Sequence, residues 1–399
     1  MKHHLALWVP GVVTALVAPM AAAQTKFELK IGGDYLFEAG YTSQNRDQNL
    51  RTTEMLNRFR LVITPVAKAD NGLEYGARVR LLNSSDPTFA ADRAYIFAIG
   101  SFGEVRLGQT NTFNDVVYAT APMDYMPLTS YDRIVNYVGP NNGQQILNGR
   151  YSGADFKGGI AGTVRGSNII SVSLADSNAT KVEYFSPRIA GLQLGASYTP
   201  RSDSSNTDVQ RVEINNAATS AATGVFGDTV EIGANYNRTF SGVNIQGSAA
   251  HLWGTAVGRN VATDRYKDLR AWQAGLQVEY AGLAAGGSYT YYGKSGQNEI
   301  AGNYTESTRT WTAGVQYSFG AYIVGANYKY GQDPGSITVR GKRKVDVYEF
   351  GAAYTVAPGL MLQAQYDHYV ADSDKSNLTG AGSADDEGNV ALVRTVLKF

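Results

Sequence analysis

FELKIGGDYLFEAGY, at residues 27–41, alternates between apolar and charged side chains. Successive side chains of a β-strand point to opposite faces, so this pattern predicts a strand with one apolar face and one ionised face. The apolar face carries Phe27, Leu29, Ile31, Tyr35, Phe37, Ala39 and Tyr41, and the charged face carries Glu28, Lys30, Asp34 and Glu38.

Segments of the same kind recur along the chain and predict about sixteen strands. Their connections alternate between tight turns and long polar loops, the latter near residues 203–227, 254–268, 294–308, 332–344 and 371–388. A meander places alternate connections at opposite ends, so one rim is short and the other long. The predicted strands lie at 27–41, 54–67, 73–83, 92–99, 104–109, 181–186, 193–199, 228–237, 243–253, 269–280, 283–292, 309–318, 321–330, 345–355, 360–369 and 389–399.

Composition excludes several classes of protein. Lys+Arg and Asp+Glu both number 35, so no basic field predicts nucleic acid as a partner. The absence of cysteine removes disulfides, thiolate metal sites and thiol nucleophiles. After residue 23 the histidines are His251 and His368, and no Gly-x-Ser-x-Gly motif is present, so we expect neither an enzyme nor a bound cofactor or metal.

The first residues have the pattern of an export signal. Lys2 begins a polar head, residues 5–20 are largely apolar, and Ala21-Ala22-Ala23 supplies the small residues that precede cleavage. We therefore predict a signal peptide at residues 1–23 and one exported barrel domain at 24–399.

Alternation alone also fits a soluble β-sandwich, so the position of the arginines matters. Arg58, Arg60, Arg78 and Arg80 all alternate with apolar residues. Facing lipid at mid-membrane, each would cost about 2–4 kcal/mol, and all four on the order of 10 kcal/mol. The alternation places each on the lumenal face of a membrane-spanning wall.

A Gly-x-x-Tyr pattern recurs in the predicted strands. Positions three apart lie on opposite faces, so we expect each tyrosine on the outer face and each glycine on the inner wall. Tyrosines at strand ends suit an interfacial aromatic belt, although strand tyrosines of a soluble protein remain an alternative. The pairs are Gly195/Tyr198, Gly233/Tyr236, Gly286/Tyr289, Gly314/Tyr317, Gly325/Tyr328 and Gly351/Tyr354.

Residues 110–149 interrupt the strand pattern. The segment has no sustained alternation and contains three prolines, Pro122, Pro127 and Pro140. We predict that it folds into the lumen as a constriction loop and that its acids face a basic cluster on the wall. The acids are Asp115, Asp124 and Asp132, and the wall cluster is Arg58, Arg60, Arg78, Arg80 and Arg106, with Arg93 a further member whose face the pattern leaves ambiguous. As the alternative, these arginines form structural ion pairs with Glu54, Glu74 or Glu104.

The chain resembles the general bacterial porins of the Gram-negative outer membrane. The resemblance rests on the signal sequence, the hairpin YFSP…GLQLGASY at 184–198, the strand GEVRLGQ at 103–109 before the long loop, and the terminal Phe399. It implies a homotrimer of 16-stranded barrels, a third outer loop folded inward, and a terminal Phe399 that the barrel assembly machinery reads.

Weaker signals concern the outer surface. The acids of the last long loop could bridge divalent cations to lipopolysaccharide, although a solvated acidic loop is the simpler interpretation; they are Asp372, Asp374, Asp385, Asp386 and Glu387. Trp253, Trp272 and Trp311 fit the aromatic belt.

Passive diffusion of small hydrophilic solutes and ions is the function that this pattern favours. A channel selective for an anion, phosphate or sugar on the same fold is the main alternative, because the wall is rich in arginine. A barrel enzyme and an adhesin with a separate passenger domain are disfavoured.

Overall fold

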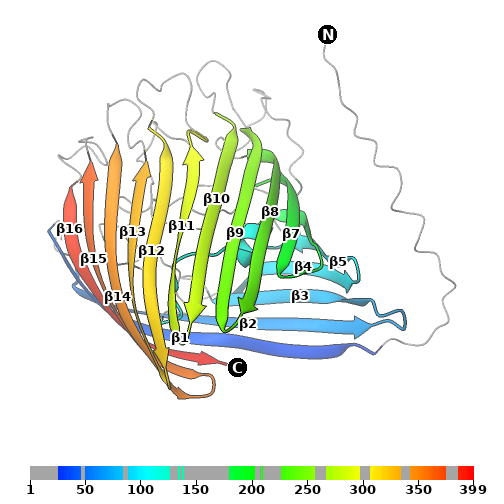
Figure 1. Ribbon diagram of the computed structural model, residues 1–399, viewed down its shortest axis with the longest axis horizontal. Helices are drawn as coiled ribbons and strands as arrows, with labels where there is room; N and C mark the ends of the chain where they lie inside the picture. The colour runs from blue at the N-terminus through cyan, green and yellow to red at the C-terminus, as the bar shows by residue number, and fades with distance from the viewer. Residues whose placement is uncertain are drawn as a thin grey trace, which may run out of the picture.

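The chain forms a closed antiparallel barrel of sixteen strands in the computed structural model (Figure 1). The structure describes residues 26–45, 50–83, 89–125, 134, 137–138, 179–202, 207, 209, 226–256, 267–296, 306–333, 342–373 and 385–399. Each strand pairs with its neighbours in sequence, and β1 pairs with β16 to close the wall. The predicted all-β barrel is thereby confirmed, whereas the predicted signal peptide lies outside the described residues.

The strand bounds extend most of the predicted ranges by a few residues. They are β1 Glu28–Gln44, β2 Thr53–Lys68, β3 Glu74–Asn83, β4 Phe89–Gly100, β5 Gly103–Gln109, β6 Thr180–Phe185, β7 Leu192–Arg201, β8 Phe226–Phe240, β9 Val243–Ala256, β10 Leu269–Tyr280, β11 Leu283–Gly293, β12 Thr308–Phe319, β13 Tyr322–Asp333, β14 Arg343–Ala357, β15 Leu360–Ser373 and β16 Asp386–Lys398. One helix, α1 Phe113–Val117, follows β5. No helix among these described residues is long and apolar enough to cross a membrane.

The apolar faces of the strands point outward, as the alternation predicts. In β1 the side chains of Leu29 and Ile31 are 59% and 62% exposed, whereas Glu38 is completely buried. A soluble protein would bury the first kind of face and expose the second. The wall is therefore inverted relative to a water-soluble domain, and its polar interior is the place to look for function.

Aromatic side chains form two rows on the outer face. One row lies toward the ends of strands between β7 and β14 that meet the long connections, here called the long-loop rim: Tyr198, Trp253, Trp272, Tyr291, Trp311, Tyr330 and Tyr348. The other lies near the tight turns, the short-turn rim: Phe240, Tyr280, Phe319, Tyr322 and Tyr354. Amphipathic rings at two levels match the two interfaces of a membrane.

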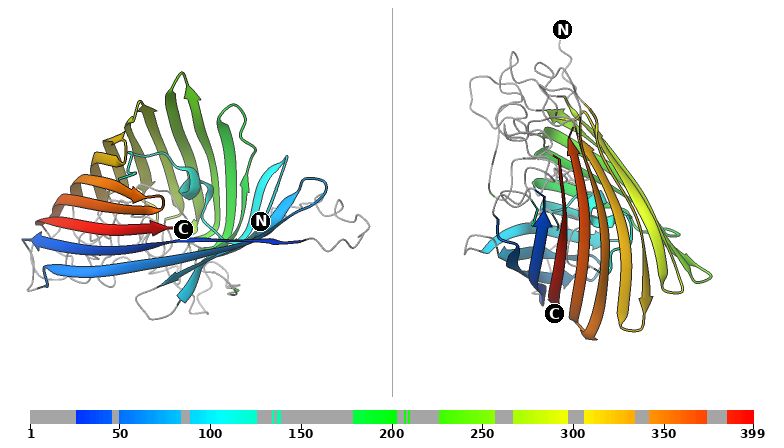
Figure 2. Two further views of the ribbon diagram at one scale, coloured as in Figure 1. Left: turned by 90° about the horizontal axis from the view of Figure 1, so that it is seen from below. Right: turned by 90° about the vertical axis from the view of Figure 1, so that its left-hand side faces the viewer.

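The end of the chain lies against its beginning at the barrel seam. The backbone N–H of Gly33 donates to the carbonyl of Phe399 at 2.9 Å, and the N–H of Phe399 donates back at 3.1 Å. The ring of Phe399 stacks on Phe59 with centroids 6.3 Å apart. The views of Figure 2 place β1 and β16 side by side accordingly.

Candidate functional site

The described part of the predicted constriction loop lies against the inner wall of the barrel, and α1 sits within the curve of the strands (Figure 2). Thr112 precedes α1, and Asp115 lies in its first turn, where a negative charge is favourable. Phe113 and Asn114 are buried against the wall. Most of residues 126–149 lie outside the described residues.

Glycines of the inner wall accommodate this segment. A Cβ built at Gly195 would lie 1.9 Å from the ring of Phe113, and one at Gly325 would lie 2.4 Å from the ring of Tyr125. Gly233 and Gly351 contact the same two rings. All six predicted glycines face inward, and the structure supplies a reason for four of them: the two rings occupy the volume of the missing side chains.

Hydrogen bonds fix the segment to the inner face of the wall from β8 to β15. The N–H of Asn114 donates to Glu231 on β8 at 2.8 Å, and the hydroxyl of Tyr125 donates to Glu349 on β14 at 3.1 Å. Further along, the hydroxyl of Tyr137 donates to Glu38 on β1 at 2.8 Å. The intermediate partners are Ser248, Gln273, Ser288, Gln316 and Gln363. The start of the segment is bonded to other strands, since Asn111 accepts from Arg93 on β4 and the carbonyl of Thr110 accepts from Lys181 on β6.

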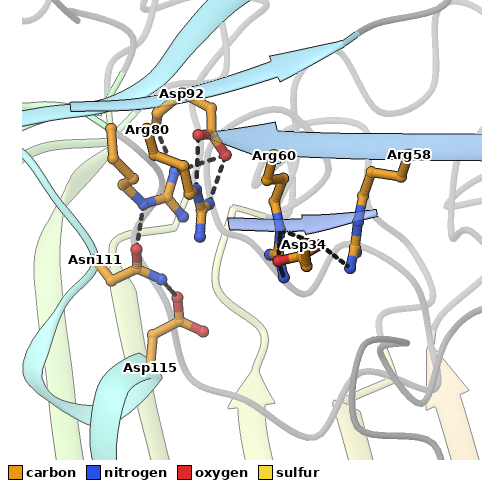
Figure 3. A network of polar contacts seen from close by, with 8 residues as sticks. Asp34, Arg58, Arg60, Arg80, Asp92, Asn111 and Asp115 are labelled. Atoms are coloured by element: carbon orange, nitrogen blue, oxygen red, sulfur yellow. Dashed lines mark hydrogen bonds and ion pairs between the residues drawn. The ribbon is translucent and has the colours of Figure 1, made fainter. Parts of the chain in front are cut away.

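Among the arginines predicted on the wall, Arg58, Arg60 and Arg80 face strand carboxylates of the inner side (Figure 3). Arg58 contacts Asp34 at 3.3 Å, and Arg60 holds both oxygens of the same carboxylate, with Nη2 2.6 Å from Oδ2. One negative charge on β1 thus faces two positive charges on β2. The register of the strands explains this, because Asp34 lies directly opposite Arg60.

A register shift in β4 resolves the ambiguity at Arg93. Arg80 pairs with Arg93 in the ladder while Leu81 pairs with Ala91, so Asp92 is the extra residue of a bulge. Arg80 binds Asp92 with Nη2 2.5 Å from Oδ2, and Arg93 lies 3.8 Å from the same carboxylate. Arg93 is buried on the inner side, and here too one acid serves two arginines.

The remaining two arginines have contrasting surroundings. Arg106 lies 2.7 Å from Glu104 and 3.6 Å from Glu183, and its guanidinium lies over the ring of Phe185. Arg78 is exposed, and within the described ranges its guanidinium has no hydrogen-bond or ion-pair partner. The proposed alternative partner Glu104 is therefore real for Arg106, whereas Arg58, Arg60 and Arg80 use Asp34 and Asp92.

The structure brings only one described acid of the segment to the cluster. Asn111 accepts from Arg93 and donates to Asp115, so its amide links the arginine cluster to this acid of the segment (Figure 3). Asp124 accepts instead from Gln316 on β12 at 2.6 Å, away from β2 and β3. Asp132 lies outside the described residues.

Sequence reasoning missed the two acids that organise the cluster. Alternation places Asp34 on the charged face of its strand, but its partners follow only from the register of β1 on β2. Asp92 was not recognised as inward-facing because both alternating sets of residues 92–99 are largely apolar. No signal in the sequence marks the bulge.

The acids of the last long loop do not converge in the described part of the chain. Asp372 pairs with Lys344 at 3.3 Å, Asp386 accepts from Tyr369 at 2.6 Å, and Glu387 lies 3.7 Å from His368. Asp374 lies outside the described residues. No group of three or more His, Asp or Glu side chains suited to a metal ion occurs among the residues that are described.

A closed wall with an apolar exterior and a charged, segment-lined interior defines a β-barrel channel of the outer membrane. The model of the family described as Gram-negative porin matches residues 11–374, so the chain belongs to the Gram-negative porin family. It is thus a channel protein of the outer membrane and not an enzyme.

Known proteins of similar length align with nearly the whole chain. Uncharacterized proteins of Rickettsia bellii and Rickettsia felis are each 24% identical over 93% of this chain and 93% of their own. A mutant of the porin of Rh. blastica has a TM-score of 0.52 at 16% identity and covers 93% of this chain and 100% of its own. A loop L8 deletion mutant of OmpT of Vibrio cholerae has a TM-score of 0.55 at 12% identity, covering 94% and 99%. These structures share the fold.

Proposed function

We propose that the water passage runs between the arginine cluster of β2–β5 and the inward segment, and that it admits small hydrophilic solutes and ions by passive diffusion. The observation that supports this proposal is that the inward segment and the arginine cluster occupy different strands of the inner wall. From Asn114 to Tyr137 the segment is hydrogen-bonded to β8–β15 and β1, whereas the arginines occupy β2–β5 and reach the start of the segment through the contact of Arg93 with Asn111. Charge on one side of a passage orients polar solutes and tunes ion selectivity.

The cluster retains positive charge despite its ion pairs. Arg58 and Arg60 share Asp34, and Arg80 and Arg93 share Asp92. Each trio therefore keeps one unit of positive charge. We propose that Arg58, Arg60, Arg78, Arg80, Arg93 and Arg106, with Asp115, Asp124 and Asp132 of the segment, set the field of the constriction.

Planar-bilayer recordings in asymmetric KCl test this proposal. Replacing Arg58, Arg60, Arg78 and Arg80 with glutamine should shift the reversal potential toward cation preference and change the conductance step. An outward arginine at the rim, Arg309, is the matched control, and Arg309→Gln should leave both values unchanged. Unchanged values in the fourfold variant would remove the cluster from the constriction.

Two single substitutions should move the reversal potential in opposite directions. Asp34→Asn removes the negative charge shared by Arg58 and Arg60, so anion preference should rise. Arg78→Gln removes a positive charge with no described counter-ion, so anion preference should fall. The same recordings measure both, and shifts of the same sign would contradict an electrostatic role. The difference should shrink from 0.1 M to 1 M salt as the Debye length falls from about 10 Å to about 3 Å.

An anion-selective channel on the same fold is the second candidate, and the exposed guanidinium of Arg78 favours it. A selective channel binds its solute in transit, so one class of anion should block the conductance in a saturable manner. A diffusion pore should instead show conductance proportional to salt concentration. Titrating phosphate, sulfate and neutral sugars separately distinguishes the two.

The family resemblance supports further proposals about export and assembly. We propose that residues 1–23 are a cleaved signal peptide, that the mature barrel is a homotrimer, and that the assembly machinery reads Phe399. Outer-membrane lipid, including lipopolysaccharide, is the expected surrounding. N-terminal sequencing of the mature protein, with Gln24 expected first, and crosslinking in detergent test the first two proposals.

A further inference from the structure

A pocket of about 450 Å³ opens on the outer face of the wall, at the long-loop rim of β8, β9 and β10. Its lining includes Asp228, His251, Trp253, Asp268 and Arg270. Trp253 lies opposite Arg270 in the ladder, and both alternate with buried, inward-facing residues such as Leu252. The pocket is therefore outside the lumen and has no part in the passage.

The backbone of the pocket is strained at Asp228. This residue has φ 48°, a left-handed conformation that non-glycine residues rarely adopt, and the register shifts between Gly227 and Val230 at the same place. The hydroxyl of Tyr198 donates to its Oδ1 at 2.8 Å and fixes the carboxylate. Strain held in place by a bulge and a hydrogen bond is a common mark of a binding site.

Hydrogen bonds hold the polar residues of the pocket in place, but not every polar side chain there has a hydrogen-bond partner. Oδ1 of Asp268 accepts from the N–H of Ala256 at 3.0 Å. The N–H of Arg270 donates to Ser295 at 2.9 Å, which fixes the backbone beneath its side chain. The guanidinium of Arg270 has no hydrogen-bond or ion-pair partner within the described part of the chain. A guanidinium presented in this way matches the geometry of a phosphate group.

Two tilted rings, here called the His251–Trp253 platform, lie beside these charges. His251 and Trp253 lie with centroids 5.4 Å apart and ring planes 33° apart. Such a surface packs against the apolar face of a sugar ring, while Asp228 and Asp268 offer acceptors to its hydroxyl groups. The volume is within the roughly 300–1,000 Å³ of small-ligand pockets.

The location indicates that the ligand is a lipid. The pocket lies at the level of the outer aromatic row, and the residue opposite His251, Ile232, is 55% exposed on the lipid-facing side. A headgroup held in the pocket would direct its acyl chains along this apolar face. We propose that the pocket binds the phosphorylated sugar headgroup of an outer-leaflet glycolipid, with Arg270 on the phosphate and the His251–Trp253 platform under the sugar. The proposal rests on the proposed lipid surrounding and not on the pore.

Native mass spectrometry of the detergent-solubilised protein tests the proposal. The probe is a diphosphorylated, acylated glucosamine disaccharide, and its dephosphorylated form and glucose 1-phosphate are compared with it. Arg270→Gln should weaken binding of the diphosphorylated probe about tenfold, the value of one charge-assisted contact. Arg238→Gln is the matched control, because Arg238 is an exposed outward arginine at the short-turn rim that packs on Phe240. The Arg238→Gln variant should bind the diphosphorylated probe as tightly as the unmodified protein does.

Three results would overturn the proposal: equal binding by Arg270→Gln, equal binding of the dephosphorylated glycolipid, or equal affinity for glucose 1-phosphate, which would indicate a soluble solute. Conductance measured on the same preparations shows that the Arg270→Gln barrel is folded. A wild-type barrel that binds the glycolipid but conducts no ions would reject the proposed pore and leave the glycolipid site standing.

Discussion

At Gly195 and Gly233 the absence of a side chain creates the space in which Phe113 lies. A Cβ at Gly233 would lie 2.8 Å from the ring, and at Gly195 1.9 Å, so an alanine at Gly195 cannot be accommodated without movement. Glycine weakens a strand because it packs poorly and loses more entropy on folding. The wall accepts that cost where the inward segment needs room.

We expect Gly195→Ala to destabilise the folded barrel by about 1–3 kcal/mol, the usual cost of overpacking. Urea unfolding followed by tryptophan fluorescence measures the loss. Gly247→Ala is the control, since a Cβ there has no neighbour nearer than 3.9 Å. Combining Gly195→Ala with Phe113→Leu should recover part of the loss. Equal stability of the two alanine variants would show that the ring does not lie against Gly195.

The face of each of these glycines could be predicted from sequence, but its neighbour could not. Alternation fixes which residues of a strand share a face, and it placed all six glycines inward. The contact with Phe113 joins residues far apart in the chain, and no local pattern encodes such a pair. The same reasoning applies to Arg60, whose face was predictable and whose partner Asp34 was not.

Among the elements, the seam between β1 and β16 joins the two ends of the wall. Arg394 on β16 donates from Nε to Glu38 on β1, and both side chains are completely buried. Arg394 also donates to Gln365 on β15 at 2.5 Å, and Glu38 accepts from Tyr137 of the segment at 2.8 Å. One ion pair therefore links the last strand, the first strand and the inward segment.

Arg394→Leu should destabilise the barrel by about 3–5 kcal/mol, because it leaves the charge of Glu38 buried without its partner. The double variant Glu38→Leu with Arg394→Leu removes both charges and should lose less than the single variant. Urea midpoints of the two proteins in the same detergent provide the comparison. A double variant that is less stable than Arg394→Leu would mean that Glu38 stabilises the barrel even without Arg394, which would contradict the expected cost of an unpaired buried charge.

The strand count and the approximate position of each strand follow from the sequence because alternation and turn residues are local signals. β4 is the exception, since both of its faces are largely apolar between residues 92 and 99. Alternation therefore could not assign Arg93, and the bulge at Asp92 depends on how β3 pairs with it. A bulge depends on how two strands pair, so the sequence of one strand does not reveal it.

For the whole molecule, the wall was predictable and the path inside it was not. Every strand carries the same period-2 pattern, so a wrong prediction for one strand does not change the prediction of a barrel. The segment after β5 carries no such repetition. Its route from Glu231 to Glu349 is fixed by single hydrogen bonds to side chains of many strands. Such contacts follow only from the assembled barrel.

The orientation of the whole wall can be tested with one charge at two depths of a single strand. In β10 the outward residues Trp272, Leu276 and Tyr280 are exposed, with Leu276 midway between the two aromatic positions. Leu276→Arg should lower the stability of the barrel folded into lipid vesicles by about 2–4 kcal/mol, because the charge meets hydrocarbon at mid-membrane. Tyr280→Arg places the same charge at the short-turn interface, where the charge itself should cost only about 0–1 kcal/mol. Reversible guanidinium titrations in vesicles measure both. Equal costs at the two depths would mean that this face of β10 does not cross the hydrocarbon, and the inside-out arrangement of the barrel would have to be abandoned.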